Sequence, residues 1–165
     1  METRFKLLGH PVHPMLIVFP LGLLSAAVIA DLVRLVTAID ELAVFSFYAI
    51  AIGVIGGLAA ALFGVIDWLA LPKATRARRI GAVHGAGNVV VVALFALSFL
   101  LRAGSDGYVP NATALVLALA GGGIALVTAW LGGELVYRLR VAVDDDAGLD
   151  ASNSLQREGV VDVKG

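Results

Sequence analysis

The sequence predicts an all-α integral membrane protein, folded as a bundle of four membrane-spanning helices. Four apolar stretches each reach the roughly 20 residues that a helix needs to cross a bilayer. Of the 165 residues, 59% are hydrophobic and only 15% are charged, and the mean hydropathy is +0.93. This is far too apolar for an ordinary soluble domain. The charged residues gather between the apolar stretches and near the chain ends, which indicates that one chain crosses the membrane four times.

The first helix is expected over residues 14–34, because proline is well tolerated at the first position of a helix. The residue before a proline avoids the α conformation, so His13 would cap this helix and His10 would lie outside it on extended chain. Pro20 lies deeper and cannot donate a hydrogen bond to the Leu16 carbonyl. We therefore predict a kink near Pro20.

The other three helices are expected over residues 42–71, 80–102 and 112–138. Small residues recur every four positions in the second of them, at Gly53, Gly57 and Ala61. The fourth contains three consecutive glycines, 121–123. Small residues at such spacings allow close packing in lipid, either within one bundle or between copies in a homo-oligomer.

The distribution of Lys and Arg predicts the orientation. Basic residues gather at the N-terminus, in the second loop and after the fourth helix, at Arg4, Lys6, Lys73, Arg76, Arg78, Arg79, Arg138 and Arg140. The first and third loops hold few, so the positive-inside rule places both termini in the cytoplasm. Residues 1–143 then form the membrane domain, and the acidic residues 144–165 form a solvated cytoplasmic tail.

Each predicted helix places an ionisable side chain near its cytoplasmic end. His84 lies about four residues inside the third helix, roughly 6 Å deep at 1.5 Å per residue. Asp67 and Glu134 lie near the same end of the second and fourth helices, and His10 and His13 near that of the first. Ionisable groups in a membrane are costly and usually face the bundle interior, where they pair or carry function. These residues therefore predict a polar layer.

Two further residues are predicted to hydrogen-bond within this layer. Asn88 follows His84 by four residues, and Tyr137 follows Glu134 by three, so each pair shares one helix face. Such neighbours orient metal ligands from outside the coordination sphere. Toward the other side of the membrane, Asp31 is expected to form a local ion pair with Arg34.

Four segments resemble, in order, the membrane family known as domain of unknown function 2231 (DUF2231). They are the run Gly-His-Pro-Val-His-Pro-Met-Leu-Ile-Val-Phe-Pro at 9–20, the end of the second helix at 64–68, Val83-His84 with Asn88, and Gly-Gly-Glu-Leu-Val-Tyr at 132–137. The resemblance covers about residues 5–143. It implies a four-helix domain of the bacterial inner membrane, sometimes fused to a Rieske-type iron–sulfur domain and hence associated with redox or haem-linked work and a redox partner protein. The 165 residues contain no such soluble domain.

Two cofactor hypotheses follow from the polar layer. A b-type haem would take His84 and either His10 or His13 as axial ligands, with small residues around His84 leaving room for the ring. A divalent metal ion would use mixed nitrogen and oxygen ligands. The candidate metal ligands are His10, His13, His84, Asp67 and Glu134.

The leading functional hypothesis is thus a redox-associated, haem-binding or metal-binding membrane subunit. The alternative is a non-catalytic structural or accessory membrane subunit whose polar layer only fixes the helix packing. A proton relay is disfavoured because few polar residues, Ser25, Ser46, Ser98 and Thr128, lie in the predicted membrane centre. The net charge of −1 with scattered basic residues gives no sign of nucleic-acid binding, and the absence of cysteine excludes thiolate-held clusters. The sequence identifies no catalytic residue and leaves enzymatic activity undecided.

Overall fold

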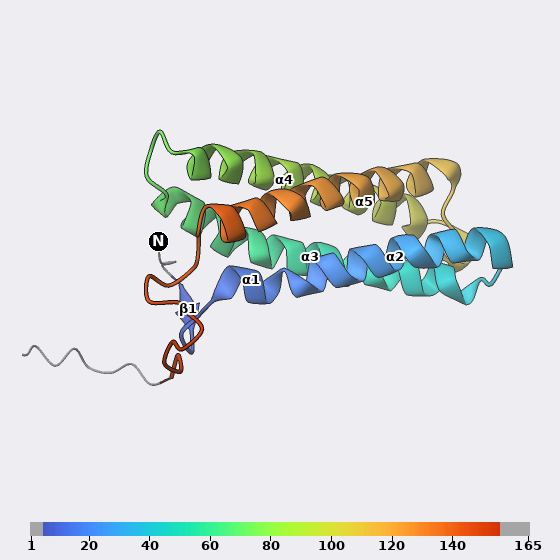
Figure 1. Ribbon diagram of the computed structural model, residues 1–165. Helices are drawn as coiled ribbons and strands as arrows, with labels where there is room; N and C mark the ends of the chain where they lie inside the picture. Colours follow the sequence, from blue (N-terminus) through green and yellow to red (C-terminus); the bar gives the residue numbers. More distant parts are fainter. Residues whose placement is uncertain (1–4, 156–165) are drawn as a thin grey trace, which may run out of the picture.

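The computed structural model describes residues 5–155, and four long helices dominate it (Figure 1). In chain order the elements are β1 (Lys6–Leu7), β2 (His10–Pro11), α1 (Val12–Leu16), α2 (Val18–Thr37), α3 (Glu41–Ala70), α4 (Arg76–Ala103), η1 (Asp106–Tyr108), α5 (Ala112–Gly133) and η2 (Glu134–Arg138). The strands β1 and β2 pair antiparallel in front of the first helix. The predicted all-α four-helix bundle is confirmed.

The bundle consists of two helical hairpins. Hairpin one comprises α1, α2 and α3, and hairpin two comprises α4 and α5. Within each hairpin the helices pack closely, and the hairpins meet where α3 packs against α4 and α2 against α5. We call the end of the bundle that carries β1 and β2 the histidine end, and the opposite end the arginine end, after His84 and Arg102.

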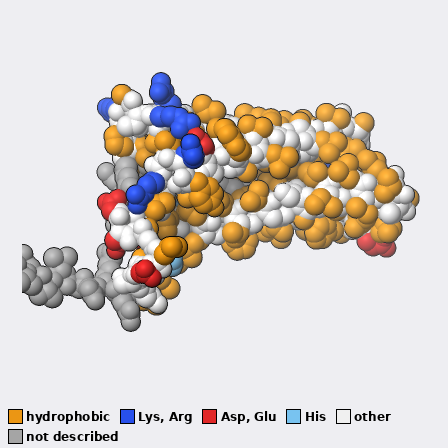
Figure 2. Space-filling model, viewed as in Figure 1, with side chains coloured by type: hydrophobic (Ala, Val, Ile, Leu, Met, Phe, Trp, Pro, Cys, Tyr) orange, Lys and Arg blue, Asp and Glu red, His pale blue; other side chains and the backbone are white. Residues whose placement is uncertain are grey.

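Four helical segments are long and apolar enough to cross a membrane, and together they make this an integral membrane protein in contact with lipid. Apolar side chains cover the length of the bundle, whereas Lys and Arg gather at the histidine end (Figure 2). A soluble monomer rarely exposes so large an apolar surface. This apolar surface therefore contacts the lipid bilayer.

The first membrane helix begins two residues before its predicted start. His13 lies within α1 and does not cap it, and a break at Ile17 separates α1 from α2. Because α2 restarts at Val18, Pro20 falls in its first turn, where backbone N–H groups have no partner within the helix. The predicted kink thus takes the form of a helix restart three residues before Pro20.

The third membrane helix begins four residues before its predicted start, at Arg76. Thr75 caps it, since its Oγ1 accepts a hydrogen bond from Arg78 N at 3.2 Å. The Arg78 guanidinium donates to Leu71 O at 2.7 Å and lies 4.6 Å from the centre of the Trp68 ring, and so closes the end of α3. His84 is therefore about 12 Å from the start of α4 at 1.5 Å per residue, farther from the helix start than predicted.

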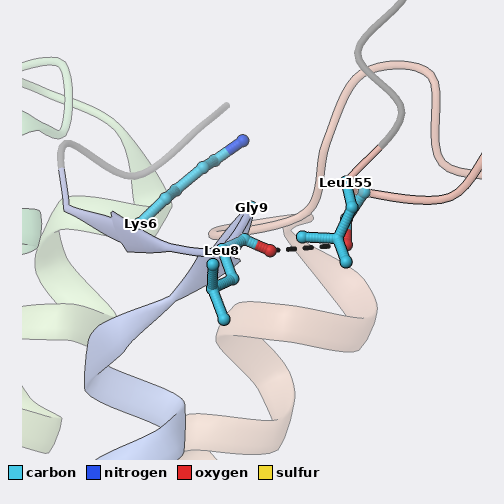
Figure 3. Close-up of a pocket in the computed structure, with 5 residues that line it drawn as sticks. Lys6, Leu8, Gly9 and Leu155 are labelled. Carbon is cyan, nitrogen blue, oxygen red and sulfur yellow. Dashed lines mark hydrogen bonds between the residues drawn. The ribbon is translucent and has the colours of Figure 1, made fainter.

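The described part of the acidic tail folds back onto the N-terminal strands. Asp144 forms an ion pair with Lys6, and Ser154 Oγ donates to Leu8 O at 3.4 Å (Figure 3). An open pocket lies between these segments, lined by Lys6, Leu8, Gly9, Ser154 and Leu155 (Figure 3). Residues 156–165 of the predicted tail lie outside the described residues.

The buried core occupies the middle of the bundle and the arginine end. Its central cluster draws on all four long helices and consists of Leu24, Ala27, Ala49, Ile50, Val91, Phe95 and Ala118. By contrast, α1 has no fully buried residue, and the first one in α4 is Val91. The histidine end is therefore the less tightly enclosed end of the bundle.

Candidate functional site

A fully buried ion pair joins the two hairpins at the arginine end. Arg102 donates to both carboxylate oxygens of Asp31, at 2.8 and 2.6 Å, and neither side chain is exposed. Its remaining donors reach Ser46 Oγ at 3.0 Å and Ser98 Oγ at 3.2 Å. The prediction of a local pair between Asp31 and Arg34 is wrong: Asp31 faces the bundle interior, where α4 supplies Arg102.

Arg34 pairs instead with Asp40, at 2.7 Å near the surface. The interior at this level is occupied by Arg102, so Arg34 finds its partner in the following turn of the chain, outside the bundle.

The two hairpins have equivalent internal contacts. In hairpin one, Ser46 Oγ donates to Ala27 O at 3.3 Å; in hairpin two, Ser98 Oγ donates to Ala114 O at 2.7 Å. Ala27 and Ser98 are separated by the same 71 residues as Asp31 and Arg102. The hairpins are therefore related by an approximate two-fold axis along the bundle, the arrangement of parallel repeats in membrane proteins.

The same relation places His13 and His84 at equivalent positions, since they too are 71 residues apart. His84 precedes Arg102 by 18 residues in one unbroken helix. Eighteen residues are five full turns, so His84 lies on the helix face that turns toward the bundle interior at Arg102. The histidines and the ion pair thus mark opposite ends of the interior, roughly 27 Å apart along α4.

Each histidine is fixed by a main-chain carbonyl of the next long helix. His13 Nδ1 lies 2.8 Å from Ala60 O, and His84 Nδ1 lies 2.8 Å from Thr128 O. One turn beyond each carbonyl is a glycine beside the imidazole. A Cβ atom at Gly64 would approach His13 Cε1 to 2.9 Å, and one at Gly132 would approach His84 Cε1 to 3.3 Å. Both imidazoles are half-buried.

These contacts fix the tautomer of both rings. A carbonyl oxygen only accepts hydrogen bonds, so Nδ1 must carry the proton and Nε2 must present a lone pair when the ring is neutral. A metal-ligating histidine has this arrangement, with one nitrogen donating to a carbonyl and the other free to bind. The pair therefore presents two Nε2 lone pairs from opposite hairpins, and that of His84 faces Asn88 Nδ2 at 3.2 Å.

We predict that long-range proton–nitrogen NMR correlations of protein labelled with 15N-histidine will show the Nδ1–H tautomer for His13 and His84 at a pH where both are neutral. His10 is the internal control, because it is exposed and faces the Ser154 hydroxyl, which can donate or accept. An Nε2–H tautomer at either His13 or His84 would contradict the hydrogen bonds described here.

Two of the other predicted ligands, His10 and Glu134, have partners of their own. His10 lies in β2, where its Nε2 is 3.3 Å from Ser154 Oγ. Glu134 forms an ion pair with Arg76 at 2.6 Å, and Asp67 is half-buried near the end of α3. Within residues 5–155, no group of three or more His, Asp or Glu side chains is placed to hold a metal ion.

The two predicted hydrogen-bonding neighbours differ in outcome. Asn88 contacts His84, with Nδ2 at 3.2 Å from Nε2 and at 2.9 Å from the His84 carbonyl. Tyr137 is 86% exposed and lies beside Gly133. The π-helical turn η2 directs it outward.

Fold and site together define a class: a four-helix integral membrane protein with a histidine pair at one end of its interior and an ion pair at the other. The chain belongs to the DUF2231 family of predicted membrane proteins, whose model matches residues 9–145. This confirms the family suggested by the sequence motifs. No curated protein and no solved structure matches the chain.

Proposed function

We propose that this protein is a redox-associated membrane subunit that holds a b-type haem between His13 and His84. The observation that carries the proposal is the two-fold equivalence of the histidines, each of which has Nδ1 bound to a main-chain carbonyl and so keeps its lone pair on Nε2. At His84 the Asn88 amide, which lies 3.2 Å from this nitrogen, would have to move for ligation. Axial imidazoles from facing helices of a bundle are a common way to hold haem.

The donor set favours haem over a free metal ion. A haem brings its own in-plane nitrogen ligands and requires only axial ligands from the protein, whereas a free zinc ion takes three or four protein ligands. Two imidazoles satisfy the first requirement and not the second, and the described residues hold no larger group of donors.

The chain itself would supply orientation and a dry environment. The carbonyls of Ala60 and Thr128 hold the rings and make them more basic ligands, and Gly64 and Gly132 let the helices approach. When bound, the haem would supply a one-electron redox centre within the membrane. The basic residues at the histidine end (Figure 2) favour a cytoplasmic location for this end in a bacterial inner membrane, where a redox partner protein would have access.

We expect protein purified after expression with haem supplied to show a Soret band that shifts on reduction with dithionite. Replacing both His13 and His84 by Ala should abolish the band, because no axial ligand remains. His10→Ala is the matched control and should retain it. A colourless, fully folded wild-type protein, or a double variant with an unchanged spectrum, would refute the proposal. The polar layer would then be left with a structural role.

A further inference from the structure

Two arginines at the histidine end, Arg79 and Arg138, are exposed and have no partner within residues 5–155. Their neighbours are engaged: Arg76 pairs with Glu134 at 2.6 Å, and Arg78 donates to the carbonyls at the end of α3. No carboxylate in the described part of the chain pairs with Arg79 or Arg138. The end of hairpin two therefore carries two positive charges that this part of the chain does not neutralise.

The ion pair between Arg76 and Glu134 brings these two charges together. It joins the start of α4 to the start of η2. Arg79 lies about one turn after Arg76, and Arg138 about one turn after Glu134. Lys and Arg side chains gather over these two elements (Figure 2). The Glu134 side chain is only 17% exposed and already has a cationic partner, so it does not oppose the binding of an anion.

The π-helical turn η2 exposes aromatic side chains beside these arginines. Tyr137 precedes Arg138 directly and is exposed, as is Trp130, which lies about one turn before Glu134. We call Arg76, Arg79, Tyr137 and Arg138 together the basic surface. Tyr and Trp side chains are enriched where a membrane meets water. The basic surface therefore lies at the level of the lipid headgroups.

Apolar side chains continue from the basic surface toward the middle of the membrane. Val83 lies about one turn after Arg79 on α4, and Val127 lies beyond Trp130 on α5; all three apolar side chains are exposed. A water-soluble anion would use only the arginines, and an uncharged lipid only the hydrocarbon. An anionic phospholipid uses both, and a guanidinium group can donate two parallel hydrogen bonds to its phosphate.

We propose that the basic surface binds the headgroup of an anionic phospholipid, whose acyl chains lie along Val83, Val127 and Trp130. Arg79 and Arg138 donate to the phosphate oxygens, and the Tyr137 hydroxyl donates to the headgroup. Arg76 stays paired with Glu134 and holds α4 and η2 at the distance that the two free arginines need. Basic side chains between membrane helices are a recognised way to bind such headgroups.

The test is a titration of the full-length protein in phosphatidylcholine bilayers with phosphatidylglycerol whose acyl chains are brominated and so quench tryptophan fluorescence. The two tryptophans, Trp68 and Trp130, both lie toward the histidine end. Phosphatidylglycerol should quench at a lower mole fraction than brominated phosphatidylcholine. Arg79→Gln and Arg138→Gln should each weaken binding about fivefold, the usual contribution of one basic side chain near an anionic membrane surface.

The matched control is Lys73→Gln, which removes the same charge from an exposed position at the same end but outside the basic surface. Its affinity should match that of the wild type, and circular dichroism should show all three variants folded. Equal quenching by both lipids, or an equal loss in Lys73→Gln and Arg138→Gln, would overturn the inference, since the attraction would then be absent or diffuse. Competition by dissolved glycerol phosphate would also overturn it, by showing a site for soluble phosphate. These measurements require no haem, so their outcome is independent of the haem proposal.

Discussion

Replacing Arg102 by Met is expected to lower the free energy of unfolding by about 3–5 kcal/mol, because it leaves the Asp31 carboxylate buried without its partner. Asp31 has no exposed surface through which water could compensate. The substitution also removes the donors to Ser46 and Ser98. Detergent-mediated unfolding in mixed micelles, followed by circular dichroism, measures the change.

Two variants separate the ion pair from simple packing. Asp31→Leu combined with Arg102→Met removes both charges and should recover most of the loss, since a buried pair replaced by apolar residues is often neutral. Arg34→Met breaks the surface pair with Asp40 and should cost no more than about 1 kcal/mol. If the double variant were as unstable as Arg102→Met alone, the unpaired charge would not be the cause.

The positions of the helices could be predicted because hydropathy and length alone determine which segments cross a bilayer. The predicted second helix, 42–71, differs from α3 by one residue at each end. Helix α4 begins four residues before its predicted start. Its arginine-rich first turn resembles a loop, although Thr75 is a good N-cap. Local signals of this kind can still be read from a sequence.

The interior pairing could not be predicted, because it depends on which helix faces turn inward. Asp31 and Arg102 lie 71 residues apart on helices of different hairpins, and Arg34 is the nearer partner in sequence. The two-fold relation between the hairpins could not be predicted from the sequence either. Lipid tolerates almost any apolar side chain on the outer faces, so the halves keep in common only a few positions where helices touch, such as Gly53 with Gly121 and Gly64 with Gly132.

The candidate site was predicted in part. The sequence pointed to His13, His84 and Asn88 by their depth and spacing, and the structure places these residues in the arrangement described above. It also predicted a single layer joined by Asp67 and Glu134, whereas Glu134 is engaged by Arg76. Arg76, at the start of α4, pairs with this carboxylate at the beginning of η2. Residues predicted to form one polar layer thus fall into two groups. His13 and His84 lie toward the bundle interior, whereas Glu134 pairs with Arg76 near the surface.

Replacing each of the three consecutive glycines of α5 by alanine should have a graded effect, because the space beside them differs. A Cβ at position 121 would lie 2.8 Å from the Phe95 ring, one at 122 would lie 3.3 Å from Val28, and one at 123 would meet nothing within 4 Å. Gly121→Ala must displace a fully buried aromatic ring and should cost about 1–3 kcal/mol of unfolding free energy.

Gly122→Ala should have a small effect, and Gly123→Ala should be neutral or stabilise by up to about 1 kcal/mol, since alanine favours helix more than glycine does. The same unfolding measurement tests all three variants. Gly53→Ala is the two-fold counterpart of Gly121→Ala, because its Cβ would lie 2.7 Å from Leu24, and should be comparably destabilising. Equal effects at positions 121 and 123 would contradict the packing of α5 against Phe95. They would indicate that the run serves as a flexible point in the helix and not as a contact surface between α4 and α5.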